Sequence, residues 1–283
     1  MVLESILNPT SAEKKPYILL FLGILYSSIA IILSLWVFES YASLVMVFLT
    51  VMACVPLIYN TIKLEEQKDL VLEKESSMLK EHSKALVFFL MLFIGTTLSF
   101  AIWYIFLPTS TGGNLFSVQI DTISTINNQV TGNFMYQLNV FTKIFLNNVK
   151  VMIFCILFAF VYGAGAIFIL IWNASVIGVA IGNMSRVVLS GYATAVGLVK
   201  VGGYFHAYSI GLLRYAIHGV PEIFAYFIAG LAGGIISVAL IRHDFGTRSF
   251  EKIIIDTSDL ILLAILFLIV AGVLEVFVTP ALF

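Results

Sequence analysis

The chain has 283 residues, of which 60% are hydrophobic and only 11% are charged, and its formal net charge is −1. Soluble domains usually carry about 25% charged residues, so this chain lacks the polar surface that water requires. The composition predicts an integral membrane protein, and the balanced charge gives no indication of nucleic-acid binding.

Several apolar stretches are long enough to cross a bilayer, which takes about 20 mostly apolar residues. The first two form a tight hairpin, because only Glu39 and Ser40 separate them. We therefore predict an all-α fold, a polytopic transmembrane helix bundle of six or seven spans. The candidate stretches are 17–38, 41–59, 85–107, 151–172, 174–201 (interrupted by Arg186), 221–241 and 260–278.

Basic residues indicate the orientation, because short loops rich in Lys and Arg stay in the cytoplasm. Five lysines lie within 61–84, whereas 109–148 contains a single basic residue, Lys143. We therefore expect the N-terminus and a charged helix at 61–84 in the cytoplasm, and an outer loop at 109–148. Within that loop, the apolar-rich segment 134–148 is interpreted as a helix on the membrane surface.

The segment 174–219 is the hardest part of the chain to place. The charge pattern requires an odd number of crossings there, and about 45 residues are too few for three spans. We expect one crossing followed by a re-entrant or interfacial segment. The predicted organisation is an N-terminal transmembrane hairpin at 1–60, the charged helix at 61–84 and a membrane domain at 85–283.

Ionisable side chains inside predicted spans need a reason, because lipid does not solvate charge. His218 and Glu222 are four residues apart and would share one face of a continuous helix, forming a polar site for a proton, an ion or a lipid headgroup. Alternatively, Pro221 begins a new helix and Glu222 lies at its positive N-terminus. Arg186 either pairs with Glu222 or extends toward the interface.

Small residues predict where helices approach closely. The pattern Gly178-x-x-x-Gly182 is typical of helix contacts in membranes, and two further clusters occur at 163–166 and 230–234. The two cysteines lie in apolar runs and suggest neither a disulfide framework nor a metal site. The chain contains no nucleophile elbow, zinc-binding helix or phosphate loop. We therefore expect no catalytic, cofactor-binding or metal-binding residues, and no cofactor.

The second half of the chain carries a recurring set of small and polar motifs. They are Asn147-Asn148, Asn173-Ala174-x-x-Ile177-Gly178 and His218-Gly219-Val220-Pro221-Glu222. In their order and spacing the chain resembles the stage II sporulation protein M family, a group of multi-pass membrane proteins. The resemblance covers roughly residues 85–280. With Arg186 added, it implies a candidate polar core of Asn148, Asn173, Gly178, Arg186, His218, Gly219 and Glu222.

The namesake of that family anchors peptidoglycan-degrading partners in the membrane and is itself not the hydrolase. The resemblance therefore implies a non-enzymatic, multi-pass scaffold or assembly protein of the cell membrane. The alternative is a channel or transporter for a small solute or ion, with a polar site near His218 and Glu222. A third reading, an enzyme acting on lipid, needs a nucleophile or metal beside those residues. The expected partners are the lipid bilayer and other membrane or envelope proteins, with a homo-oligomer as an option, and no nucleic acid.

Overall fold

The computed structural model describes residues 15–71, 75–127, 134–162, 166–192, 198–241 and 246–282. Every regular element in these segments is a helix, and seven of the helices are long and apolar enough to cross a bilayer. The prediction of an all-α, polytopic bundle is therefore confirmed. The elements are α3 (Tyr17–Val37), η1 (Glu39–Tyr41), α4 (Ala42–Val71), α5 (Glu75–Phe106), α6 (Thr109–Leu115), α7 (Ser117–Asn127), α8 (Phe134–Tyr162), α9 (Ala166–Ser190), α10 (Leu198–Ile241), α11 (Arg248–Val273), the π-helical η2 (Leu274–Val278) and α12 (Thr279–Leu282).

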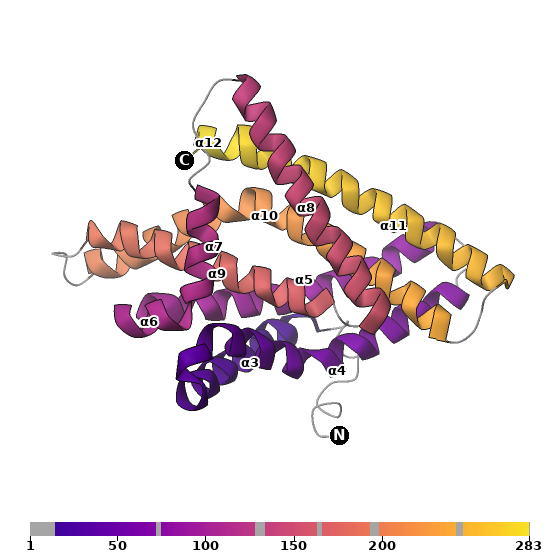
Figure 1. Ribbon diagram of the computed structural model, residues 1–283, viewed down its shortest axis with the longest axis horizontal. Coiled ribbons are helices and arrows are strands. Elements are labelled where there is room, and N and C mark those ends of the chain that lie inside the picture. The colour runs from indigo at the N-terminus through magenta and orange to yellow at the C-terminus, as the bar shows by residue number, and fades with distance from the viewer. Residues whose placement is uncertain are drawn as a thin grey trace.

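The bundle is built around α5, α9 and α10 (Figure 1). The hairpin of α3 and α4 covers one side of these three helices, and α8 and α11 cover the other. The short helix η1 makes the turn between α3 and α4, where the sequence predicted a tight hairpin. Side chains that point away from these contacts are apolar and exposed, as expected for a surface that faces lipid.

Glycines set the closest helix contacts. A Cβ atom on Gly23 of α3 would lie 2.6 Å from the Leu92 carbonyl oxygen of α5, and one on Gly95 would overlap the backbone of Leu20. Gly178 and Gly182 of α9 pack in the same way against α5, which confirms that small residues mark helix contacts here. Gly233 of α10 packs against α8. Residues 163–165 of the other predicted cluster lie outside the described residues.

The structure corrects the start of the fourth span. The surface helix predicted at 134–148 is the first half of α8, which runs without a break through Tyr162 and supplies the candidate span Gln137–Phe160. Polar residues such as Gln137 and Lys143 obscured this helix in the sequence. The outer loop predicted at 109–148 is therefore shorter, and it contains the two helices α6 and α7.

The structure shows two long helices in the segment 174–219, which was hardest to place from the sequence. Residues 166–190 form α9, and 198–241 form the single 44-residue helix α10, whose part Val201–Ile241 is one candidate span. Helix α10 is about twice as long as one crossing requires, so the re-entrant or interfacial segment stays a prediction. Pro221 lies inside α10 rather than at its start. A proline removes one backbone hydrogen bond, but membrane helices tolerate this loss when neighbouring helices pack against the site. Glu222 therefore does not cap a helix.

The side chain of Gln119 in α7 links the segment 109–127 to the bundle by hydrogen bonds. It is fully buried, accepts a hydrogen bond from the Ser43 hydroxyl of α4 at 2.8 Å, and donates one to the Ser175 hydroxyl of α9 at 3.2 Å. One side chain thus joins three helices that are far apart in the sequence. The sequence analysis did not identify this residue.

Replacement of Gln119 by leucine is expected to lower the free energy of unfolding by about 2 kcal/mol, because two buried hydroxyls lose a partner. Unfolding in mixed micelles of increasing denaturing detergent would measure the change. Asn114→Leu, at an exposed position of α6, is the matched control and should leave the unfolding midpoint unchanged. Equal midpoints for the two variants would contradict the assignment.

Candidate functional site

The middle of α10 carries three polar side chains on one face. His218, Glu222 and Tyr226 follow one another at intervals of four residues, so they are stacked along the helix. The Tyr226 hydroxyl is completely buried and donates a hydrogen bond of 2.8 Å to Oε1 of Glu222. Because α10 continues through Pro221, the sequence-based alternative in which His218 and Glu222 share a face is the one the structure supports.

A second carboxyl group faces this stripe from the C-terminal helix. Glu275 lies in the π-helical turn η2, and its carboxyl interacts electrostatically with that of Glu222. One turn later, the buried Thr279 hydroxyl lies 3.2 Å from Nδ1 of His218. A π-helical turn shifts the register of the side chains that follow it and is frequent at functional sites. The π-helical turn thus carries a carboxyl toward α10, and the helix α12 that follows it contacts His218.

Glu275 was not among the predicted site residues, although the sequence contains a signal for it. It is the only charged residue between 260 and 283. A lone carboxyl in an apolar run of this length must find a polar partner or a proton. The partner, Glu222, is more than 50 residues away in the chain, so only the fold brings the two together.

Helix α8 also packs against α10 and carries a buried polar side chain. Asn148 is 5% exposed, and its side-chain amide nitrogen is buried without a hydrogen-bond partner. Cys155, seven residues later on the same face, is also buried. Helix α8 packs along α10, the helix that carries Glu222. A buried amide without a partner costs about 1–3 kcal/mol, so it needs a reason.

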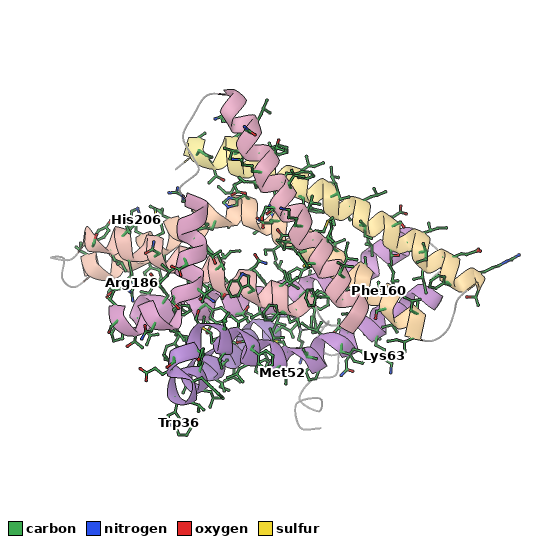
Figure 2. The ribbon with its side chains drawn as sticks, in the orientation of Figure 1. Trp36, Met52, Lys63, Phe160, Arg186 and His206 are labelled. Atoms are coloured by element: carbon green, nitrogen blue, oxygen red, sulfur yellow. The ribbon has the colours of Figure 1, made fainter. Side chains whose placement is uncertain are left out.

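The remaining predicted residues lie elsewhere. Arg186 does not reach Glu222: its Nη2 donates hydrogen bonds to the Tyr104 and Leu107 carbonyls at the C-terminal end of α5, and its guanidinium lies 4.7 Å from the centre of the Tyr104 ring. Of the two alternatives that the sequence left open for Arg186, the structure does not show the pairing with Glu222. Figure 2 shows Arg186 and His206 at one end of the bundle and Lys63 toward the other.

Asn173 and Gly178 of α9 also lie apart from the carboxyl pair. The Asn173 side chain donates to the backbone oxygen of Ile169 one turn earlier, at 2.8 Å, which is a contact within its own helix. Gly178 packs against α5, and Gly219 lines an apolar groove. Of the seven predicted residues, the structure thus brings His218 and Glu222 into one polar stripe, and it buries Asn148 in the neighbouring helix α8.

We name the group of Tyr226, Glu222, His218, Glu275 and Thr279 the polar centre. It combines two carboxyls, a phenol, an imidazole and a hydroxyl between two membrane helices, so it can hold a proton or a small cation and pass a proton among its members. Among the described residues, no three His, Cys, Asp or Glu side chains converge as a metal-binding site requires.

The fold and the polar centre define a multi-pass α-helical membrane protein with an acidic site inside the bundle. The family described as Stage II sporulation protein M (SpoIIM) matches residues 84–280, more than two thirds of the chain, and the chain belongs to this family. The resemblance inferred from the sequence motifs is thereby confirmed. Neither the curated proteins nor the solved structures give a match.

Proposed function

We propose that the protein is a non-enzymatic scaffold or assembly protein of the cell membrane, with its N-terminus in the cytoplasm. The observation that carries the proposal is the hairpin of α4 and α5. Its helices continue past the candidate spans, which end at Leu64 and begin at Lys84, as far as Val71 and from Glu75. At about 1.5 Å per residue, they project roughly 10 Å and 13 Å beyond the membrane-spanning parts.

The composition of this projection supports a docking role. The sequence of this projection is rich in lysine, glutamate and aspartate, which suits recognition by another protein. Charged surfaces of this kind select partners by complementary charge. The five lysines of 61–84 support a cytoplasmic location for the projection, and with seven crossings the C-terminus would then lie outside. The partners we propose are other membrane or envelope proteins, or a second copy of the chain.

The test is site-specific photo-crosslinking in intact cells. A photoreactive residue at position 68 or 81 is expected to give one discrete crosslinked species, and the same residue at Phe21, on the lipid-facing side of α3, is the matched control. Lys63→Glu, Lys68→Glu and Lys80→Glu combined should abolish the species without changing the amount of protein in the membrane. A diffuse pattern at both projection positions, unchanged by charge reversal, would contradict a docking role.

The polar centre favours a second candidate, a transporter or channel for a proton or small cation. Two ionised carboxylates in this proximity repel each other, so a proton or cation held between Glu222 and Glu275 stabilises the pair. The Tyr226 hydroxyl already donates to one of the two groups. Intramembrane acidic residues in such arrangements often belong to ion or proton pathways.

If the protein is a transporter or channel, liposomes that contain the purified protein should lose a proton or sodium gradient faster than empty liposomes. Replacing either Glu222 or Glu275 by glutamine should then reduce the flux at least tenfold, because one carboxyl cannot share the ion. Glu39→Gln, in the turn between α3 and α4, is the control and should keep the wild-type rate. If the wild type and all variants gave the same flux as empty liposomes, the transport proposal would be contradicted and the scaffold proposal would stand.

A further inference from the structure

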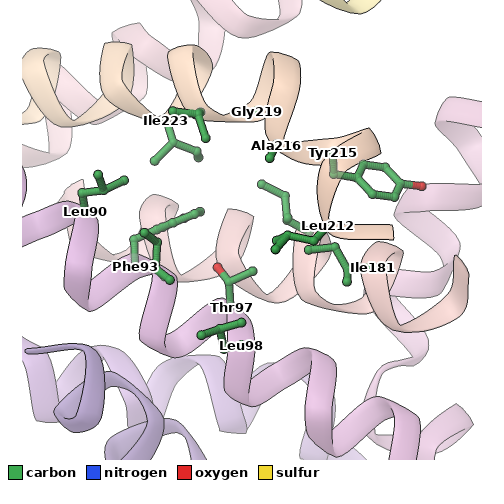
Figure 3. Close-up of a pocket in the computed structure, with 13 residues that line it drawn as sticks. Leu90, Phe93, Thr97, Leu98, Ile181, Leu212, Tyr215, Ala216, Gly219 and Ile223 are labelled. Atoms are coloured by element: carbon green, nitrogen blue, oxygen red, sulfur yellow. The ribbon is translucent and has the colours of Figure 1, made fainter. Parts of the chain in front are cut away.

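A cavity of about 80 Å³ lies between α5, α9 and α10. Figure 3 shows Phe93 and Thr97 of α5 on one side, Ile223 of α10 opposite them, and Ile181 of α9 beside Leu212. All three helices are candidate membrane spans at this level. We name this cavity the α5–α10 groove.

The groove is deep on the bundle side and open on the other. Its floor consists of Phe93, Thr97 and Ile223, which are 8%, 7% and 2% exposed, whereas Leu212 and Val220 at its rim are 38% and 44% exposed. Leu212 and Val220 belong to the candidate span Val201–Ile241, so we take the opening to face lipid hydrocarbon. The groove therefore communicates sideways with the bilayer.

Gly219 lines this groove and differs from the glycines that set the helix contacts. A Cβ atom on Gly178 or Gly233 would collide with a neighbouring helix, but one on Gly219 would meet no atom within 4 Å. Gly219 thus leaves space that no helix fills. Unfilled space beside buried side chains forfeits dispersion contacts, which an apolar guest would restore.

The shape of the groove indicates the guest. Leu90, Ile94 and Leu98 line it at intervals of four residues along α5, which corresponds to about 12 Å parallel to the helix axis. Hydrocarbon chains of the bilayer run in this direction. We propose that the α5–α10 groove binds the hydrocarbon chain of a membrane lipid, and that Gly219 is the residue that leaves room for it.

One polar atom lies in the floor. The Thr97 hydroxyl is buried without a hydrogen-bond partner, and the carbonyl of Phe93, which it would usually use, already accepts from Thr96. A hydrocarbon chain offers no acceptor, so Thr97→Val is expected to leave binding unchanged. This variant separates a plain chain from a guest that carries an oxygen at this depth.

The experiment uses the full chain in vesicles of phosphatidylcholine containing a small fraction of the same lipid with a diazirine on its chain. Native mass spectrometry after gentle extraction is expected to show one retained lipid per protein, and the photo-adducts should map to the groove residues Leu90, Leu98 and Leu212. Gly219→Leu fills the groove and should reduce the retained lipid at least fivefold. Gly202→Leu, the same change at an open and exposed position of the same helix, should not.

Thermal unfolding of each variant, monitored in parallel, shows whether Gly219→Leu remains folded. If Gly219→Leu does not fold, the photo-adduct map of the wild-type protein alone tests whether the groove binds the lipid chain. Adducts spread evenly over the groove and the lipid-facing side of α11 would overturn the proposal, as would equal lipid retention in the Gly219 and Gly202 variants. Loss of lipid in Thr97→Val would also overturn it, because the guest would then carry a hydrogen-bond acceptor.

Discussion

Replacement of Gly95 by leucine is expected to reduce the yield of folded protein at least tenfold. A Cβ atom at this position overlaps the backbone of Leu20, and backbone cannot move aside as a flexible side chain can. Overpacking in a close-packed interior typically costs about 1–3 kcal/mol, and contact with backbone places this change at the upper end of that range or above it. The fraction of monodisperse protein after gel filtration, together with its unfolding midpoint, measures the effect.

Gly113→Leu is the matched control for this experiment. Gly113 is exposed in α6, and a Cβ atom there would meet no atom within 4 Å. The control variant should fold like the wild type. If the two variants gave the same yield and midpoint, the close approach of α3 and α5 would be wrong.

Replacement of Arg186 by methionine is expected to lower the free energy of unfolding by about 3 kcal/mol. The guanidinium makes two hydrogen bonds to carbonyls at the end of α5, where the helix dipole favours a positive charge, and it lies against the Tyr104 ring. Charge-assisted bonds contribute about 1.5–3 kcal/mol, and the ring contact adds about 0.5–1 kcal/mol. Lysine at this position keeps the charge but cannot form the planar two-bonded arrangement, so Arg186→Lys should be intermediate.

A double-mutant cycle identifies the partner of Arg186. Because Arg186 and the carboxyl pair lie at different places in the bundle, the effects of Arg186→Met and Glu222→Gln on the free energy of unfolding should add. An interaction energy above about 1 kcal/mol would instead restore the pairing of Arg186 with Glu222 that the sequence alone had left open. Chemical unfolding of the four proteins in the same bicelles supplies the values.

Most of the fold could be predicted because its signal is local. A bilayer imposes one length and one composition on every span, so α3, α4, α5 and α11 are visible as apolar runs. Helix α8 has the lowest mean hydropathy of the seven candidate spans, and the polar residues of its first half concealed its start. Pro221 misled in a similar way, since a proline usually begins or breaks a helix in water but is tolerated inside a packed membrane helix.

The candidate site could be predicted only in part, because its signal is not local. His218 and Glu222 were identifiable from their spacing on one helix. The contacts with Glu275 and Thr279 depend on a π-helical turn and on the packing of α10 against α11, neither of which follows from periodicity. Gln119 was missed for the same reason, since its two partners belong to helices on either side of it.

The length of α10 has a consequence for the membrane around the protein. Its 44 residues correspond to about 66 Å, roughly twice the thickness of the hydrocarbon core. Such a helix must tilt strongly or leave the bilayer at one end. Near its N-terminal end, the stacked rings of Tyr204 and Phe106 are suited to the headgroup region. A thicker or thinner bilayer would then change the tilt angle of α10. Hydrophobic mismatch would thus act directly on the helix that bears Glu222, so bilayers of different thickness would change how that helix is tilted.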